Sequence, residues 1–223
     1  MSRFTLYSGP LSMFGAKAQI AALEKGLAFD LVMVPFDFNT GYSPKHPDVL
    51  RLNPKKQVPV LVDGDLVLFD STQIFEYLED LQPEPRLWPA DVRERARARQ
   101  LELQSDEVYF PYIIKLMGLQ SQLREDTARA AIAGASKVCL HMERLLEESD
   151  WLAGPYTYAD IAFYMATFFG ERLGAPLTPE LPRLLAWRDR MQARPAVRQV
   201  AGEMARWLEA EHRPLPSALR ALL

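Results

Sequence analysis

Three prolines close together, Pro83, Pro85 and Pro89, divide this 223-residue chain into two parts with different sequence patterns. A proline lacks the backbone N–H that a helix interior needs, so residues 82–89 are predicted to form a linker between domains. Strand and helix patterns alternate in residues 1–81, whereas residues 90–223 contain helical patterns. The chain is therefore predicted to join an α/β domain to an all-α bundle.

The first part predicts a β-α-β unit, a loop and then a β-β-α unit. Short runs of β-branched and aromatic residues indicate the strands, and Gly26 provides a C-terminal stop for the first helix. Asp63-Gly64 is a residue pair that favours a tight hairpin turn with positive φ at both central positions. The expected strands are residues 3–7, 29–34, 60–62 and 66–69, and the expected helices are residues 15–25 and 70–81.

The second part is predicted to be an all-α bundle. Its strongest local signal is the stretch WLAGPYTYADIA at residues 151–162. Thr157 is expected to cap a helix there, and Asp160 to reach back to the free N–H groups of its first turn. The expected helices are residues 91–109, 124–148, 157–172, 184–194 and 196–211, with Pro111 as a kink or break.

Composition limits the partners that this chain is expected to have. It carries 29 acidic against 26 basic residues and no long block of one sign, so neither nucleic acid nor a membrane surface is expected. The start of the chain lacks the apolar core of a signal peptide, and the single Cys139 excludes an internal disulfide, so a cytoplasmic location is expected. Cys139 itself is expected to be a small core residue. The three histidines lack the spacing of metal ligands, and no metal is expected.

Pro59 interrupts an otherwise regular strand pattern. The stretch QVPVLVD at residues 57–63 has the composition of a buried strand, yet a proline inside it removes a ladder hydrogen bond. Prolines in sheets normally lie at edges, strand starts or bulges. An ordinary strand start is one explanation, and a backbone turn with a special role for Val58 is the other.

Four stretches together resemble the cytosolic glutathione transferases, in particular the bacterial, theta-, phi- and tau-like members that use a serine. They are SMFGAKAQI at residues 12–20, NPKKQVPVL at 53–61, DSTQI at 70–74 and WLAG with TYAD within 151–160. These are similar to the family's serine loop, cis-proline segment, glutathione motif and helical capping motif, and the resemblance covers essentially the whole chain. It implies a thioredoxin-like N-terminal domain, an all-α C-terminal domain and a homodimer that uses glutathione as co-substrate.

The resemblance also assigns residues to the parts of glutathione. A cis Pro59 would turn the backbone so that the N–H and C=O of Val58 pair with the cysteinyl backbone. Asp70 would hold the glutamyl ammonium, Ser71 at a helix N-terminus would bind the glutamyl carboxylate, and Gln57 would bond the same moiety. Lys45 or Lys56 could bind the glycyl carboxylate, and Lys55 lies nearby in sequence. Lys45 is the predicted partner.

Ser12 is the catalytic residue that the resemblance implies. Its hydroxyl would donate to the glutathione sulfur at the start of the first helix and so stabilise the thiolate. Tyr7 is the runner-up because other classes of the family keep a catalytic tyrosine at the end of the first strand, and Ser8 follows it. Met13 stands where proline is common and Lys17 where arginine is usual, so an inactive site stays open as an alternative.

A pocket for a hydrophobic electrophile is expected between the two domains. Its walls would be Leu11, Met13 and Phe14 on one side and Tyr109, Tyr112, Ile113 and Met117 on the other, although such side chains at helical spacing are equally typical of a core. Two functions stay open. One is a glutathione transferase, and the other is a non-catalytic binding or regulatory protein similar to the family's stress-response members.

Overall fold

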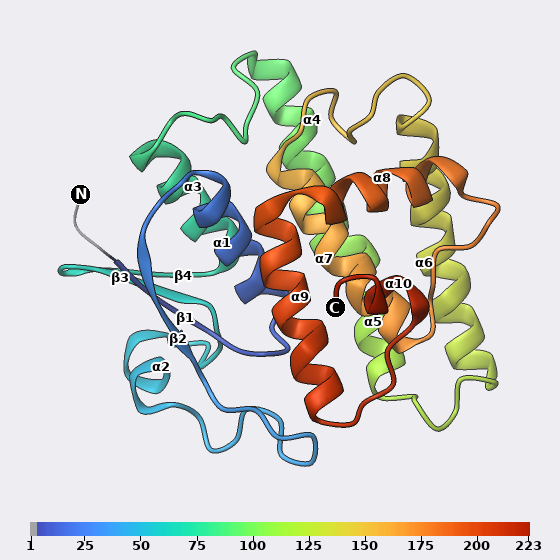
Figure 1. The fold of residues 1–223 in the computed structure, drawn as a ribbon, viewed down its shortest axis with the longest axis horizontal. Coiled ribbons are helices and arrows are strands. Elements are labelled where there is room, and N and C mark those ends of the chain that lie inside the picture. The colour runs from blue at the N-terminus through green and yellow to red at the C-terminus, as the bar shows by residue number, and fades with distance from the viewer. Residues whose placement is uncertain (1–3) are drawn as a thin grey trace. The chain divides into compact units, whose positions relative to one another are not determined.

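The computed structural model describes residues 4–223. The chain falls into two compact units, the first ending at Arg86 and the second beginning at Leu87. The first unit is a four-stranded sheet with helices, and the second is helical (Figure 1). This confirms the predicted fold class, a thioredoxin-like α/β domain followed by an all-α domain. Within residues 4–223 no helix is both long and apolar enough to cross a membrane.

The sheet of the first unit is mixed, with the strand order β2-β1-β3-β4. β1 (Phe4–Ser8) is parallel to β2 (Phe29–Met33) and antiparallel to β3 (Val60–Asp63), which is antiparallel to β4 (Leu66–Phe69). Parallel neighbours need a crossover connection, and α1 (Met13–Glu24) supplies it. The predicted strands agree closely with these bounds, and the predicted start at residue 3 lies outside the described residues.

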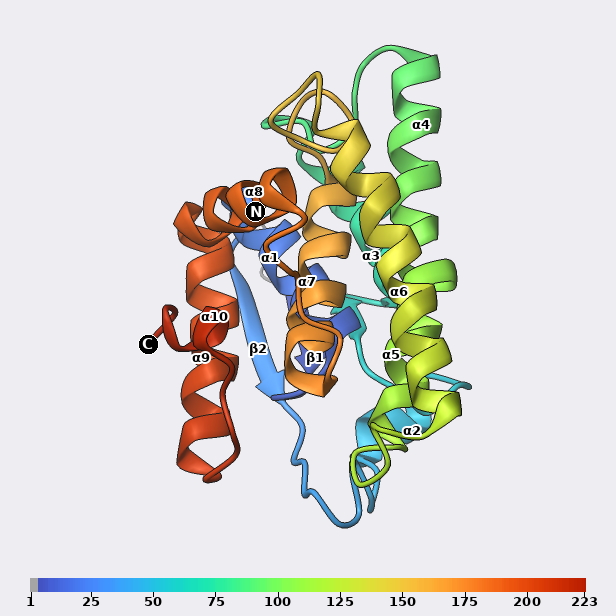
Figure 2. The ribbon, with the colours of Figure 1, turned by 90° about the vertical axis from the view of Figure 1, so that its right-hand side faces the viewer.

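Helices lie on both faces of this sheet. α1 and α3 (Ser71–Leu81) cover one face, and the short α2 (Pro47–Leu52) lies at the other (Figures 1 and 2). A buried cluster of Val34, Val49 and Val60 ties α2 to the strands. The sequence predicted a loop in place of α2, because a helix of six residues is too short to show helical periodicity.

The predicted hairpin between β3 and β4 is present, but its turn lies one residue later than expected. Asp63 ends β3 and pairs with Leu66, so Gly64 and Asp65 are the central residues of the turn. Of these two, only Gly64 has a positive φ, of 61°. Glycine at the first central position is characteristic of a type II′ turn, whereas the prediction assumed positive φ at both positions. The Tyr77 hydroxyl donates to the Asp63 carboxylate at 2.7 Å and helps to hold Asp63 in the strand.

One buried lysine holds the C-terminal end of the first unit. Lys25 follows α1, and its side chain has no exposed surface. Its Nζ donates to the carbonyl oxygens of Gln82 at 2.7 Å and Pro85 at 3.0 Å, and it pairs with Glu79. A buried ammonium needs such partners, so the first part of the predicted linker is fixed against the helices of the first unit.

The second unit is built around α7 (Tyr158–Leu173), which is buried along nearly its whole length and lies at the centre of this unit (Figure 2). Leu87 begins the unit, and its carbonyl oxygen accepts the Tyr158 N–H at 3.0 Å, so the last residues of the predicted linker pack within the bundle. The helices are α4 (Val92–Leu103), a π-helical segment (Gln104–Tyr109), α5 (Phe110–Met117), α6 (Asp126–Leu145), α7 (Tyr158–Leu173), α8 (Pro182–Ala193), α9 (Pro195–Ala210) and α10 (Ser217–Arg220).

Pro111 does not separate two helices as expected. It lies in the first turn of α5, which continues without a gap from the π-helical segment Gln104–Tyr109, so the proline removes one backbone donor from a continuous helical run. The irregularity falls just before it, in the π-helical segment that connects α4 to α5. The predicted break is therefore absent, and the helical run instead changes to a π-helical segment directly before the proline.

The predicted helix cap at Thr157 is confirmed, and its acidic partner has more contacts than expected. Thr157 and Asp160 form a reciprocal capping box at the start of α7. The fully buried Asp160 carboxylate also accepts the Leu152 N–H at 3.0 Å and the Trp187 indole N–H at 2.9 Å. Asp160 therefore joins the preceding loop, α7 and α8.

Candidate active site

Ser12 immediately precedes α1 and caps it. Its Oγ accepts the Gly15 N–H at 3.0 Å, and only 7% of the residue is exposed. Among residues 4–223, no group accepts the hydroxyl hydrogen of Ser12. The side chain therefore keeps one donor beside the positive end of the helix dipole, where an anion such as a thiolate is stabilised.

Gly15 allows the end of β1 to lie close to the first turn of α1. A Cβ at this position would overlap the Ser8 hydroxyl and would also crowd the Ser12 hydroxyl. The buried Ser8 Oγ accepts a hydrogen bond from the Gln19 side-chain amide at 2.7 Å. A glycine is needed at residue 15 because no side chain fits between these hydroxyls.

Tyr7 alternates with Ser8 along β1 and contacts α2. Its hydroxyl donates to Asp48 Oδ2 at 3.2 Å, and its ring lies 5.6 Å from that of His46. Burial and, to a smaller extent, the hydrogen bond to Asp48 raise the pKa of Tyr7. The phenol is thus protonated, but its proton already has a carboxylate acceptor. This geometry favours Ser12 over Tyr7 as the donor to a ligand.

Val58 precedes the sheet and has unpaired backbone groups. The Val58–Pro59 peptide bond is cis, as predicted, and β3 begins only at Val60. Within the described part of the chain, neither the N–H nor the C=O of Val58 forms a hydrogen bond. Both groups are therefore available to an extended peptide that binds by strand addition. The Asn53 side chain fixes the preceding loop by donating to the Gln57 carbonyl oxygen at 2.6 Å.

Asp70 caps α3 in an unusual backbone conformation. Its φ is 78°, in the left-handed region that residues other than glycine rarely occupy. Its Oδ1 accepts the Thr72 N–H at 3.1 Å, while the side chain remains 41% exposed. Strain of this kind costs on the order of 1–3 kcal/mol and is common at binding sites. Ser71, next along the chain, is buried in the first turn of α3.

Lys55 is the lysine whose side chain lies beside Asp70. Its Nζ lies 3.7 Å from the Asp70 carboxylate, and both residues line a shallow depression together with Phe69. Lys45 and Lys56 are exposed, and Lys56 has a positive φ of 55°. The side chain of Gln57 is also exposed.

The predicted electrophile-pocket residues lie in different environments. Leu11 is buried and Phe14 is half-buried in the first unit. Tyr109 and Ile113 have no exposed surface, and the Tyr109 ring packs 5.2 Å from that of Phe163 in the core of the helical unit. Tyr109 and Ile113 are therefore core residues of the helical unit.

Tyr112 differs from Tyr109 and Ile113 because it keeps some exposed surface. Its ring lies directly on Gly134 of α6, where a Cβ would overlap it. The Lys115 ammonium lies 5.9 Å from the centre of the same ring. The orientation of Tyr112 is thus set by α6.

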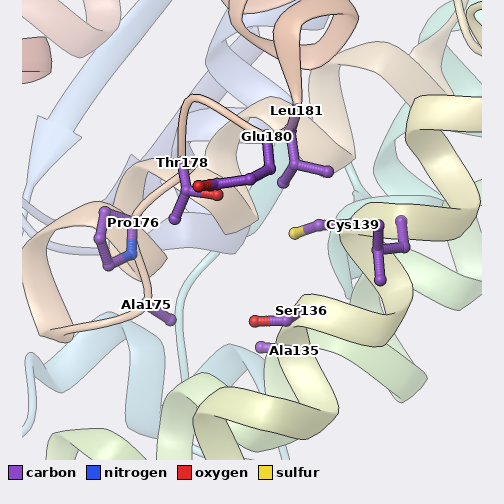
Figure 3. A pocket seen from close by; sticks show the side chains of 9 residues that line it. Ala135, Ser136, Cys139, Ala175, Pro176, Thr178, Glu180 and Leu181 are labelled. Atoms are coloured by element: carbon purple, nitrogen blue, oxygen red, sulfur yellow. The ribbon is translucent and has the colours of Figure 1, made fainter.

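The helical unit has a cavity of about 190 Å³ between α6 and the segment that joins α7 to α8 (Figure 3). Cys139 lies on its wall and is 4% exposed. Burial raises the pKa of Cys139 to about 12, so the thiol is protonated and unreactive near neutral pH. The buried position agrees with the predicted core role. The lining residues are Ala135, Ser136, Cys139, Leu140, Ala175, Pro176, Thr178, Glu180 and Leu181.

Two contacts in the first unit, near the predicted glutathione-binding residues, were not predicted from the sequence. One is the ion pair between Lys55 and Asp70, and the other is the acceptance of the Leu11 N–H by the Tyr42 hydroxyl oxygen at 3.3 Å. Both join residues that are far apart in sequence, so no local pattern signals them. In the range 4–223, no group of three or more histidine, cysteine, aspartate or glutamate residues is placed to hold a metal ion.

Comparison with known proteins gives a consistent result. Residues 6–86 match the family model described as glutathione S-transferase, N-terminal domain, and residues 106–195 match the corresponding C-terminal domain. Glutathione S-transferase 1 from Triticum aestivum is 31% identical over 92% of this chain and 96% of its own. A stringent starvation protein A homolog from Coxiella burnetii is 43% identical over 102 residues, which are 45% of each chain.

A solved structure also resembles this chain. It is the theta class glutathione S-transferase from Xanthomonas axonopodis pv. citri with glutathione bound, which has a TM-score of 0.74 and 27% sequence identity. The match covers 89% of this chain and 97% of that one.

Proposed function

Because this chain belongs to the glutathione S-transferase family, we propose that it is a serine-type glutathione transferase that acts on hydrophobic electrophiles. It binds glutathione on its N-terminal unit, and Ser12 stabilises the thiolate after the thiol proton has passed to solvent. The thiolate sulfur attacks an electrophilic carbon and forms a sulfur–carbon bond. The bond to the leaving group breaks, and the leaving group departs with its electron pair.

The observation that carries this proposal is the state of the Ser12 hydroxyl. It is buried, caps α1 through Gly15, and keeps an unused donor at the start of that helix. A thiol that titrates near ~8.5 is mostly protonated at neutral pH, so catalysis requires a lower thiol pKa. A donor and a helix dipole at one point both favour the thiolate.

The energies indicate that Ser12 does not act alone. Lowering the thiol pKa by about two units requires ~2.7 kcal/mol of selective stabilisation. One neutral hydrogen bond contributes ~1 kcal/mol, and a helix terminus adds ~0.3–1 kcal/mol at an exposed site and up to ~2 kcal/mol when partly buried. The hydroxyl and the α1 dipole together therefore reach the required size, which makes the geometry of the loop before α1 decisive.

The remaining glutathione contacts follow from the same unit. Val58 pairs its N–H and C=O with the cysteinyl backbone, and Gln57 bonds the glutamyl end. Asp70 holds the glutamyl ammonium, for which it must exchange the ammonium of Lys55 that now lies 3.7 Å away. Ser71 and the N-terminus of α3 bind the glutamyl carboxylate. Lys45 remains the proposed partner of the glycyl carboxylate.

Hydrophobic electrophiles are proposed because apolar residues are concentrated near Ser12. Leu11 and Phe14, on either side of it in sequence, are the proposed contacts in the first unit. A cytoplasmic homodimer is part of the proposal. Light scattering tests the dimer, and a single-chain mass would contradict it.

A binding or regulatory role without catalysis is the second candidate. It is favoured by the 43% identity to the stringent starvation protein A homolog, which exceeds the 31% identity to the wheat transferase although it spans less of the chain. Met13 in place of the common proline is consistent with a changed serine loop. In this case Val58 and Asp70 would bind glutathione, or a similar peptide, without activating it.

Affinity chromatography on immobilised glutathione followed by an assay with a chloronitrobenzene separates the candidates. Retention with turnover supports the transferase, whereas retention without turnover supports the binding protein. Ser12→Ala should reduce kcat at least about fivefold, the factor that corresponds to ~1 kcal/mol of lost hydrogen bonding. Ser136→Ala, which alters an exposed serine of α6, is the matched control and should retain full activity. A protein that binds no glutathione would contradict the transferase proposal.

A further inference from the structure

We propose that Tyr42 is a positioning residue for Ser12, so that the loop between β2 and α2 sets how well the thiol is activated. Tyr42 belongs to neither α1 nor the glutathione motif, and it acts on Ser12 through the turn that precedes α1. The inference rests on the proposed function of Ser12 and goes further by naming the residue that holds its loop.

Tyr42 contacts this turn in two ways. Its hydroxyl oxygen accepts the Leu11 N–H at 3.3 Å. Its ring lies against Gly9, where a Cβ would overlap the ring carbons and the hydroxyl. One side chain thus fixes both the position of the Gly9 backbone and the direction of the Leu11 amide.

The turn transmits these contacts to Ser12 because it is short and hydrogen-bonded. The Ser12 N–H donates to the Gly9 carbonyl oxygen at 3.1 Å, and the Ser12 carbonyl oxygen accepts the Ala16 N–H at 2.9 Å. The Ser12 N–H therefore donates to Gly9, whose backbone lies against the Tyr42 ring. The residue directly before Ser12 is Leu11, whose N–H donates to the Tyr42 hydroxyl oxygen. A shift of Tyr42 moves the hydroxyl of Ser12 relative to the end of α1.

Tyr42 is itself held rigidly by its own loop. Asp37 and Gly41 exchange backbone hydrogen bonds of 2.9 and 2.6 Å, which close a tight turn directly before Tyr42. The Phe36 ring packs edge-on against the Tyr42 ring with 4.8 Å between centroids. Tyr42 also packs on the buried cluster of Val34, Val49 and Val60. A phenol anchored on three sides is suited to hold a neighbouring turn.

The chemistry of the phenol suits this role. Burial raises the pKa of Tyr42 well above its ordinary value, so the hydroxyl stays neutral across the working pH range. The neutral oxygen accepts the Leu11 N–H. Tyr42 therefore adds no negative charge to a site that must stabilise an anionic sulfur.

The first test uses Tyr42→Phe, which keeps the ring on Gly9 and removes only the acceptor of the Leu11 N–H. Amide hydrogen exchange is measured without glutathione, and the Leu11 amide is expected to exchange about fivefold faster, as for the loss of a hydrogen bond of ~1 kcal/mol. The pKa of bound glutathione, followed by the ultraviolet absorbance of the thiolate, is expected to rise. The kcat is expected to fall more than the KM for glutathione changes.

Tyr77→Phe is the matched control. It removes a tyrosine hydroxyl that donates to Asp63 at 2.7 Å in the same unit, away from the serine loop. It should change neither the Leu11 exchange rate nor the thiol pKa.

Gly9→Ala tests the contact between Gly9 and Tyr42 by changing the glycine. The added methyl group displaces the Tyr42 ring, while the Tyr42 hydroxyl is retained. It should raise the thiol pKa, and its effect should be non-additive with that of Tyr42→Phe. An unchanged thiol pKa in Tyr42→Phe, or an equal change in Tyr77→Phe, would overturn the inference.

Failure of the proposed function gives a different result. In that case the wild-type protein itself would leave the glutathione thiol at its free pKa, whatever residue stands at position 42. The exchange rate of the Leu11 amide is measured without glutathione, so it would still show whether Tyr42 holds the turn before α1. An unchanged exchange rate in Tyr42→Phe would contradict this role of Tyr42.

Discussion

Replacing Asp160 by asparagine should destabilise the helical unit, although the two side chains have nearly the same shape. One carboxylate oxygen accepts the Leu152 N–H at 3.0 Å and the Trp187 indole N–H at 2.9 Å. The other accepts the N–H and the hydroxyl of Thr157 at 2.9 and 3.2 Å. An asparagine has only one acceptor oxygen, so in either orientation its NH₂ group faces one of these two pairs of donors.

The cost follows from the number of donors left without an acceptor. Asp160 is fully buried, so water does not replace the lost contacts. A buried donor without a partner costs ~1–3 kcal/mol. The loss is about 2–6 kcal/mol where the NH₂ group faces the Leu152 and Trp187 donors, and ~1–3 kcal/mol where it faces Thr157, because the Thr157 hydroxyl can turn and accept from it. Because a domain is typically stable by only ~5–15 kcal/mol, the loss is a large part of the free energy of unfolding.

Urea denaturation followed by circular dichroism measures this loss. Asp150→Asn is the matched control, since the Asp150 side chain is 77% exposed and lies 3.6 Å from an Arg190 guanidinium nitrogen. The control should change the free energy of unfolding by no more than ~0.5 kcal/mol. Equal unfolding midpoints for Asp160→Asn and Asp150→Asn would refute the reasoning from unpaired donors.

Three further predictions concern single side chains. Cys139 in the native protein should react with a thiol reagent at about pH 8 roughly a thousandfold more slowly than Cys139 of the urea-unfolded protein. The reason is that a pKa of about 12 leaves almost no thiolate. Rapid labelling of the native protein would contradict the burial of Cys139. Lys25→Met should lower the free energy of unfolding by at least ~2 kcal/mol, because it leaves buried acceptors unpaired. The exposed Lys137→Met should change the urea midpoint little, and equal midpoints would contradict the role of Lys25. Tyr7→Phe should leave the pKa of bound glutathione unchanged, because the Tyr7 hydroxyl donates to Asp48; a raised thiol pKa would assign the donor role to Tyr7.

The elements with strong local patterns were predictable from the sequence. The strands, α1, α3 and the capping box at Thr157 depend on side chains that are close in sequence, so their signals are local. α2 was missed because six residues carry too little periodicity. The turn at Gly64 was displaced by one residue because pairing between Asp63 and Leu66 sets the hairpin register, which the preferred residue pair alone does not determine.

The candidate site was predictable only where it consists of motifs. Ser12, the cis Pro59 and Asp70 each lie in a stretch that resembles the family, and the structure places Ser12 and Asp70 at helix caps. Tyr42 and Lys55 had no such signal. Tyr42 is 31 residues from the Leu11 amide that it bonds, so its role emerges only when the β2–α2 loop is folded against the turn before α1.

The most direct test of the proposed activity is the pKa of the glutathione thiol bound to the wild-type protein and to Ser12→Ala. In the wild type the bound thiol should titrate about two units below its free value of ~8.5. Ser12→Ala should raise it by about 0.7 units, the shift that corresponds to one hydrogen bond of ~1 kcal/mol, and Ser12→Thr should restore it. A thiol pKa that is the same in the wild type and Ser12→Ala, or that equals the free value in the wild type, would contradict the role of Ser12.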